Sequence, residues 1–154
     1  MYVIRAQTGE ETEVCKILRE KHLYPILPSK IMYIRRFGKW RKEEQILMPG
    51  YIFLKKNEIT AREYYKIKSI PGVIGILGTD GKLSPLPKNE ESFIDLLNNG
   101  GKPIEPVKIT NVPAVVINGR SFRVLKIFKR QKRVRIYIDI FGKEHNIDIA
   151  AEIV

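Results

Sequence analysis

Residues 120–142 read RSFRVLKIFKRQKRVRIYIDIFG, and the second half of this stretch alternates apolar and polar side chains. In Val134–Ile140 the aliphatic residues take every second position, with Arg135, Tyr137 and Asp139 between them. Successive side chains of a strand point to opposite faces, so this pattern indicates a strand with one buried and one outward face. The stretch therefore predicts β structure in the C-terminal part of the chain.

The first half of the same stretch is strongly basic, with eight cations and no carboxylate in residues 120–135. Apolar residues alternate with these cations, which a disordered tail would not need, so a basic surface on a folded element is expected. An outward tyrosine among cations suits phosphate contact together with base stacking. The predicted RNA-binding residues, here called the C-terminal basic group, are Arg120, Arg123, Lys126, Lys129, Arg130, Lys132, Arg133, Arg135 and Tyr137. The structural alternative is a solvated face.

Around this stretch the C-terminal part shows strand patterns alone, which predicts a small all-β barrel of SH3-like size. Turns are expected at Asn118-Gly119 and Gly142-Lys143. The predicted strands are Val107–Ile109, Val115–Ile117, Phe122–Phe128, Val134–Phe141 and His145–Ile149.

The N-terminal part mixes strand and helix patterns in the order β-α-β-β-α-β-α, which predicts an α+β domain with helices against an antiparallel-rich sheet. The expected strands are Tyr2–Ala6, Ile31–Phe37, Ile46–Leu54 and Val73–Leu77, and a turn is expected at residues 78–81. The expected helices run from a capping box at residues 8–11 to about His22, over Ala61–Ser69 and over Glu90–Leu97. Asparagine, glycine and proline then predict a linker. The predicted division is 1–98, linker 99–106 and 107–154.

A second basic group lies at the tip of the hairpin predicted around residues 38–42. Its members, here called the hairpin basic group, are Arg35, Arg36, Lys39, Trp40, Arg41 and Lys42. A solvated hairpin and a nucleic-acid contact are both open interpretations.

The composition indicates a polyanionic partner, because the 154 residues carry a formal net charge of +11. Residues 99–154 hold 11 basic and 5 acidic side chains, so a net +6 falls on about a third of the chain. No apolar run is long enough to span a bilayer, no signal peptide is visible, and Cys15 is the single cysteine. A monomer in the reducing cytoplasm, without membrane contact, is expected.

The sequence shows no group of residues typical of a catalytic site, so no enzyme activity, metal or cofactor is expected. His22 and His145 have no cysteine or histidine at metal-ligand spacing, and residues 72–75 (GVIG) lack the lysine of a phosphate loop. Cys15 lies beside the apolar stripe of the first predicted helix and is expected to pack there.

Three motifs resemble a known family. Residues 2–11 (YVIRAQTGEE), 48–53 (MPGYIF) and 69–73 (SIPGV) resemble the N-terminal domain of the NusG transcription elongation factors in order and spacing. Residues 134–142 and 144–149 look like the last strands of that family's C-terminal KOW domain. The resemblance implies an N-terminal NGN-like domain followed by a KOW barrel.

The same resemblance implies that the N-terminal domain docks on the clamp helices of RNA polymerase through an apolar patch. The positions that match this patch are Met1, Met48 and Tyr51, with Ile70 close by; the alternative is that these residues are core. The hairpin basic group would contact non-template DNA or form a second wall of an RNA site. The predicted function is transcription elongation and antitermination, with nascent hairpin RNA bound by the KOW face and less pausing and termination.

Departures from the family point to a specialised paralogue. Phe122 stands where the first KOW strand usually has glycine, and Pro113-Ala114-Val115 replaces the usual GPF turn. With the C-terminal basic group, these differences make the chain most similar to the LoaP-type antiterminators, whose targets include a structured leader RNA. The rivals are a housekeeping NusG whose KOW domain binds Rho or a ribosomal protein, a ribosome-associated KOW protein that binds RNA, and a nucleic-acid enzyme.

Overall fold

The computed structural model describes residues 1–79, 82–109 and 114–153, and the chain divides into two compact units. The first unit comprises Met1–Leu27 and Met48–Glu91, and the second comprises Pro28–Leu47 and Ser92–Val154. Residues 28–47 therefore group with the C-terminal part of the chain. The predicted domain boundaries at residues 98 and 106 stay a prediction. None of the helices in the described ranges is long and apolar enough to cross a membrane.

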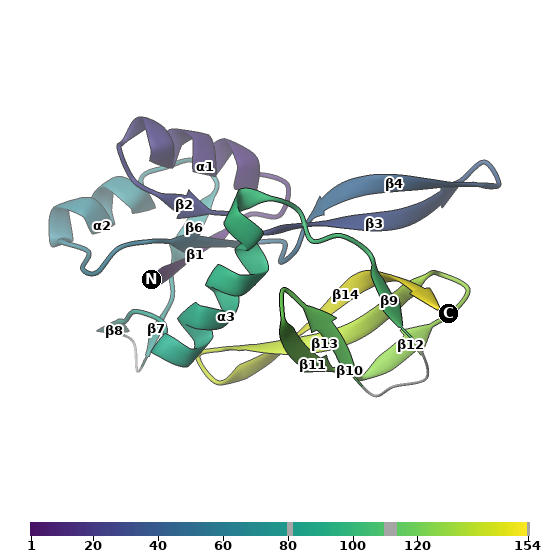
Figure 1. The fold of residues 1–154 in the computed structure, drawn as a ribbon. Helices are drawn as coiled ribbons and strands as arrows, with labels where there is room; N and C mark the ends of the chain where they lie inside the picture. Colours follow the sequence, from purple (N-terminus) through teal and green to yellow (C-terminus); the bar gives the residue numbers. More distant parts are fainter. Residues whose placement is uncertain (80–81, 110–113, 154) are drawn as a thin grey trace. The chain divides into compact units, whose positions relative to one another are not determined.

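The first unit is built on a four-stranded sheet in the order β2-β5-β1-β6. Figure 1 labels its strands β1, β2 and β6 and the helices α1 and α2 of the same unit. The predicted strand at the N-terminus is confirmed and lies in the centre, antiparallel to β5 and β6. The strands are β1 (Tyr2–Ala6), β2 (Pro25–Ile26), β5 (Tyr51–Leu54) and β6 (Val73–Ile76). Two short strands, β7 (Gly78–Thr79) and β8 (Lys82–Leu83), pair beyond β6. Asp80 and Gly81 of the predicted turn lie outside the described residues.

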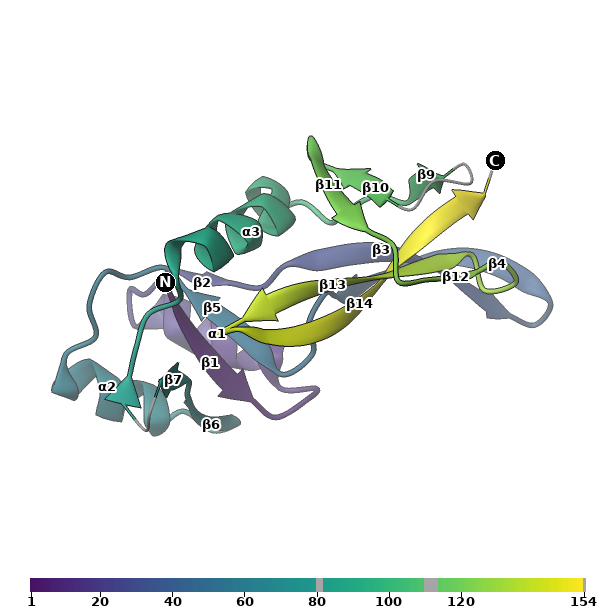
Figure 2. The same cartoon turned by 90° about the horizontal axis from the view of Figure 1, so that it is seen from below.

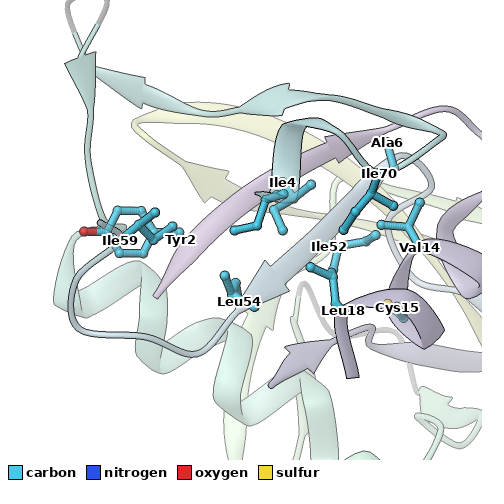
Figure 3. Packing of buried hydrophobic residues seen from close by; sticks show 11 residues of the cluster. Tyr2, Ile4, Ala6, Val14, Cys15, Leu18, Ile52, Leu54, Ile59 and Ile70 are labelled. Carbon is cyan, nitrogen blue, oxygen red and sulfur yellow. The ribbon is translucent and has the colours of Figure 1, made fainter. Parts of the chain in front are cut away.

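Helices α1 (Glu11–Glu20) and α2 (Ala61–Lys68) contribute to one apolar core with the sheet (Figure 3). Alternate residues of β1 enter this core from the sheet, as the period of two requires. The buried members are Tyr2, Ile4, Ala6, Val14, Cys15, Leu18, Ile52, Leu54, Ile59, Ile67 and Ile70. The prediction that Cys15 packs against the apolar stripe is confirmed. Burial raises the pKa of its thiol to about 11.

The capping box predicted for α1 is wrong, and the side chain of Glu11 has a different partner. No side chain caps α1; the Glu11 carboxylate accepts instead from the backbone N–H of Gly9 at 2.6 Å and of Gly50 at 2.9 Å. Gly50 has a φ of +86°, and a Cβ there would meet the Ala6 carbonyl oxygen at 3.4 Å. The Pro-Gly motif is therefore a tight turn held against the start of α1. A complete capping box occurs at Thr60 and begins α2.

The hairpin that opens the second unit differs from the predicted one. Strands β3 (Ser29–Arg36) and β4 (Lys39–Ile46) pair directly through a two-residue turn at Phe37-Gly38. Both turn residues have positive φ, 52° and 74°, which is the backbone of the tight turns that match strand twist. The predicted tip at residues 38–42 is wrong. The predicted return strand Ile46–Leu54, interrupted at Pro49-Gly50, is correct only over Tyr51–Leu54, which is β5 and pairs with β1 instead of β3. Residues 39–42 lie within β4, and the proline-glycine pair separates β4 from β5.

The C-terminal strands confirm the predicted all-β character, with one strand more than expected. They are β9 (Val107–Ile109), β10 (Ala114–Ile117), β11 (Arg120–Arg123), β12 (Lys126–Phe128), β13 (Arg133–Ile140) and β14 (Lys143–Ile153). β10 pairs with β11, and the other four form a sheet in the order β12-β13-β14-β9. The predicted strand Phe122–Phe128 is divided because the chain passes from one sheet to the other at residues 124–125. Pro113 lies outside the described residues.

The strand predicted from the alternating pattern of Val134–Ile140 is confirmed as β13. Val134, Ile136, Ile138 and Ile140 are buried, at most 3% exposed, while the residues between them are half-exposed. The turn after β13 is formed by Phe141-Gly142, one residue earlier than predicted, since both have positive φ and Ile140 pairs with Lys143. The predicted α+β region followed by a small all-β region is therefore the observed fold class.

The region before β9 is more ordered than its composition suggests. Helix α3 (Lys88–Asn98) is followed by a 3-10 turn, η1 (Asn99–Gly101). Ile104 is buried and forms a parallel bridge with Lys30, and its carbonyl oxygen accepts from the N–H of Ile31 at 2.8 Å. Part of the stretch predicted as a linker is thus fastened to β3.

Candidate nucleic-acid interface

The β3–β4 hairpin is joined to β14 within the second unit, and the two run side by side in Figure 2. The Lys30 ammonium donates to the backbone carbonyl oxygen of Asp148 at 2.6 Å, and the Tyr33 hydroxyl donates to Glu152 Oε1 at 3.0 Å. Lys30 is 8% exposed, and burial lowers its pKa, with Asp148 acting in the opposite direction and Arg133 in the same direction. A buried ammonium is stable only with a partner, so this contact orients the hairpin.

Lys132 connects the two basic groups that the sequence suggested separately. Its ammonium lies 4.9 Å from the ring centroid of Trp40 and 5.4 Å from that of Tyr33. Such cation–π contacts require the cation to lie over the ring face. The hairpin aromatic residues and the turn between β12 and β13 therefore form one surface, although almost a hundred residues separate them in sequence.

The register of the hairpin divides its cations between two faces. Tyr33 pairs with Lys42 and Arg35 pairs with Trp40, so these four side chains share the face that Lys132 contacts. The guanidinium of Arg35 lies 5.9 Å from the Trp40 ring centroid. The cations on the opposite face are Arg36, Lys39 and Arg41, of which Arg36 forms an exposed ion pair with Glu43 at 3.3 Å. Only half of the hairpin basic group thus faces the C-terminal basic group.

The turn between β12 and β13 carries three cations of the C-terminal basic group. Lys129 and Arg130 are exposed, and in the described part of the chain neither makes an ion pair or a ring contact. Lys132 has a φ of +53°, and its N–H donates to the Lys129 carbonyl oxygen at 3.3 Å. Lys129, Arg130 and Lys132 are called the turn cations below. Lys132 lies over the Trp40 ring, and none of the three has to break an ion pair with a described residue before it meets an anion.

Asp148 neutralises two other members of the C-terminal basic group, and the sequence analysis missed it. Its carboxylate accepts from Arg135 Nε at 2.8 Å and Nη2 at 3.3 Å, and lies 3.5 Å from Arg133 Nη1. Burial acts to raise the pKa of Asp148, but the hydrogen bond and charge of Arg135, with the charges of Arg133 and Lys30, lower it overall. The one signal in the sequence for this ion pair was the position of Asp148, which lies directly opposite Arg135 in a hairpin of β13 and β14.

Lys126 and the same Arg135 both lie over one ring, that of Phe128. The ammonium of Lys126 and the guanidinium of Arg135 lie 5.0 and 4.9 Å from the ring centroid of Phe128. β12 pairs with β13 so that Lys126 is opposite Arg135, which explains why both reach one ring. Contacts of this kind fix the direction of long side chains and lower the entropy lost when they bind an anion.

The remaining predicted residues lie at the other end of β13. Arg120 stacks over Phe93 of α3 at 3.8 Å, and Phe93 packs against Phe122 with centroids 5.8 Å apart. Arg123 and Tyr137 line a common hollow there. The C-terminal basic group is therefore not a single patch: the turn cations, the Asp148 cluster and this end are three separate environments.

The residues that match the family's polymerase-binding patch are mostly buried. Met1 and Met48 are 4% and 5% exposed, and Ile70 belongs to the core of the first unit. Tyr51 is half-buried; Arg5 donates to its hydroxyl at 2.8 Å and lies over its ring at 4.7 Å. Their role in docking stays a prediction. Among the described residues, no three histidine, cysteine or acidic side chains are grouped to hold a metal ion.

Known proteins resemble this chain along most of its length. The family model for transcription termination factor NusG matches residues 1–95. The transcription termination/antitermination protein NusG of Rickettsia prowazekii is 32% identical over 96% of this chain and 85% of its own. That of Haemophilus influenzae is 27% identical over 96% and 89%.

The fold agrees with these relatives. The solved structure of Thermotoga maritima NusG matches 97% of this chain and 92% of its own with a TM-score of 0.55 and 23% identity. The family model covers more than half of the chain, and the Rickettsia relative exceeds 30% identity over nearly all of it. The chain thus belongs to the NusG family of transcription termination and antitermination proteins.

Proposed function

We propose that this protein is a specialised antitermination factor that docks on RNA polymerase with its first unit and binds a nascent RNA hairpin with its second. Held in this way, polymerase would pause and terminate less. The functional type that we propose is the LoaP-type antiterminator, with a structured leader RNA as its target.

The observation that carries this proposal is the contact of Lys132 with Trp40 and Tyr33. It brings one half-exposed cation, next to the exposed Lys129 and Arg130 in the chain, onto two aromatic rings, and cations with rings are the combination that binds single-stranded nucleic acid by charge and stacking. A-form RNA hides the base edges of its major groove, so sequence-specific proteins recognise loops and bulges. The turn cations would contact loop phosphates while an unpaired base stacks on Trp40.

The test is charge reversal of the turn cations in the full chain. The variant Lys129→Glu/Arg130→Glu/Lys132→Glu is expected to bind leader-type RNA hairpins at least ten-fold more weakly near 150 mM salt. Each lost phosphate contact lowers the slope of log K against log salt by about 0.7–0.9, so the slope should become shallower by roughly 2–3. Fluorescence anisotropy with labelled hairpins at four salt concentrations measures both quantities.

A matched control reverses three cations elsewhere in the protein, so its net charge changes by the same amount. Lys16, Arg62 and Lys66 are exposed residues of the first unit, so reversing these three cations removes the same total charge away from the proposed surface. The control is expected to keep most of the affinity and the full salt slope. Equal losses in both variants would show that only overall charge matters and would overturn the assigned surface.

Docking on polymerase is proposed for the apolar positions that match the family patch, Met1, Met48, Tyr51 and Ile70. Of these, Tyr51 is the most accessible, and its ring lies at the start of β5 beside Arg5. Ile70 supports the core on which that surface rests. The second face of the hairpin, with Arg36, Lys39 and Arg41, is free of the RNA surface and is proposed to face non-template DNA.

A second candidate function is a protein contact by the C-terminal strands, as in a factor whose KOW domain binds Rho or a ribosomal protein. The observation that favours it is the exposure of three apolar side chains in this region: Val116 of β10 at 63%, Leu125 between β11 and β12 at 46%, and Ile127 of β12 at 36%. A ribosome-associated role would use the same surface. Copurification with polymerase rather than with ribosomes separates the ribosome-associated role from the proposed one.

A further inference from the structure

A small hollow lies at the end of the second unit opposite to the turn cations. Its volume is about 160 Å³, below the roughly 300–1,000 Å³ of sites for drug-sized ligands, so it suits one planar group. Three aromatic side chains, one arginine and one carboxylate contribute to its wall. The lining residues are Phe93, Ser121, Phe122, Arg123, Tyr137, Ile138 and Asp139.

The backbone of β13 is open toward this hollow. The Arg135 carbonyl oxygen accepts from the N–H of Leu125 at 2.7 Å, so backbone groups of Arg135 point to the β12 side. Alternate residues of a strand direct their backbone groups to the same side, and Tyr137 and Asp139 follow at this spacing. β12 pairs with residues 133–135 only. Among the described strands, none pairs with residues 137–139 on this side, so polar backbone groups are available to a ligand.

The charges divide the site into an acidic wall and a basic rim. Asp139 is half-buried and has no ion pair with any residue that the structure describes, although Arg123 lines the same hollow. Arg123 is exposed, and Arg120 stacks on the outer ring, Phe93, at 3.8 Å. A carboxylate repels a phosphate, so an RNA ligand would leave its phosphates at the two arginines and insert a base.

We infer that this hollow binds one unpaired guanine base of the RNA, with Asp139 accepting from its Watson–Crick edge. Guanine presents two adjacent donors on that edge, N1–H and the 2-amino group, which a carboxylate accepts as a pair. Adenine, cytosine and uracil each offer a single donor there. The aromatic walls supply the stacking surface that unpaired bases use in RNA-binding proteins. This inference rests on the proposed RNA binding and adds the identity of one recognised base.

The experiment uses the full chain and RNA hairpins with a fixed stem and a loop of six uridines. In six further hairpins, one loop uridine at a time is replaced by guanosine. At least one guanosine hairpin is expected to bind about 5- to 150-fold more tightly than the all-uridine hairpin, the range for a bidentate base contact. Inosine at that position lacks the 2-amino group and is expected to lose a large part of the gain.

Three variants separate base recognition from general binding. Asp139→Asn is expected to remove the preference for guanosine over inosine, a ratio measured within the variant itself. Arg123→Gln should weaken all hairpins by a similar factor and keep the preference. Glu144→Gln is the matched control, since Glu144 faces Asp139 across β13 and β14 but does not line the hollow; it should keep both.

The outcomes distinguish this inference from the proposed function. Tight binding of every hairpin with no guanosine preference, or a preference that Asp139→Asn retains, would overturn the guanine site and leave RNA binding standing. Binding of no hairpin by the unaltered protein would overturn both. Circular dichroism of each variant shows whether the fold is intact, and a folded Asp139→Asn protein with unchanged discrimination decides against the inference.

Discussion

The carboxylate of Glu11 links two motifs that lie about forty residues apart in sequence. Its two oxygens accept from the backbone N–H groups of Gly9 and Gly50, and the residue is 1% exposed. Hydrogen bonds to a charged acceptor are worth more than neutral ones, and a buried N–H without a partner costs further free energy. One acidic side chain thus stabilises both the start of α1 and the turn before β5.

Glu11→Ala is expected to lower the free energy of unfolding by about 2–4 kcal/mol, because two backbone donors lose their acceptor and the Gly50 N–H is left buried. Glu11→Gln keeps one amide oxygen and should lose less. Urea unfolding followed by circular dichroism measures both. Glu13→Ala, an exposed change in the same helical turn, serves as the control. A loss for Glu11→Ala no greater than for Glu13→Ala would contradict the role given to Glu11.

At the scale of elements, the hairpin of β3 and β4 and the pair of β13 and β14 meet at one charged cluster. Asp148 accepts from Arg135, lies close to Arg133, and offers its backbone oxygen to Lys30 of β3. This carboxylate has two effects on the proposed surface. It fixes the direction of two arginines, and it neutralises charge that would otherwise act on RNA.

The pH dependence of stability should reflect this cluster. The pKa of Asp148 is lowered in the folded protein, so its contribution is present above the ordinary aspartate value near 4 and is lost as the pH falls below it. Asp148→Asn is expected to cost about 1–3 kcal/mol at pH 7. The unaltered protein should approach the variant as the pH is lowered from about 5 to 2.

Chemical unfolding at a series of pH values measures this convergence, with Glu144→Gln as an exposed control on the same strand pair. A constant difference between the unaltered protein and Asp148→Asn across the whole range would show that the carboxylate charge does not stabilise the cluster. The same variant removes a counter-charge from Arg133 and Arg135. Its effect on the RNA salt slope therefore indicates whether those arginines reach phosphate.

At the scale of the whole molecule, the two proposed activities belong to two different compact units. The apolar positions of the polymerase patch lie in the first unit, and the RNA surface with its hairpin lies in the second. A factor that holds polymerase with one unit raises the effective concentration of the other near the emerging RNA. The two activities should then be separable by substitution.

Tyr51→Ala is expected to reduce copurification with RNA polymerase several-fold, because it removes the most accessible ring of the proposed patch, and to leave hairpin RNA affinity unchanged. The turn-cation variant should behave in the opposite way. Tyr24→Ala, which removes an aromatic ring that is 75% exposed elsewhere in the first unit, is the control. Pull-down from a lysate and anisotropy on the same preparations measure both activities. If Tyr24→Ala reduced copurification with polymerase as well, the assignment of polymerase binding to the patch would be contradicted.

Local patterns were sufficient for much of the fold. The strand Tyr2–Ala6 was predicted from a short apolar run, and β13 was predicted from a period of two, both of which are local patterns. The prediction of the hairpin was wrong for a local reason. β4 is rich in charged residues and lacks a buried face, so the return strand was assigned to the more apolar stretch that follows it. The two positive-φ residues of its turn include a phenylalanine, which gives no turn signal.

The sequence by itself determined the fold class, the family and the identity of the basic residues, because these depend on composition, periodicity and motif spacing. The tertiary structure alone decided which cations are free and which are neutralised. The position of Lys132 over Trp40, the ion pair of Arg135 with Asp148 and the common hollow of Asp139 and Arg123 are set by packing and strand register. Such contacts depend on where separate elements meet, and no pattern within a single element encodes that position.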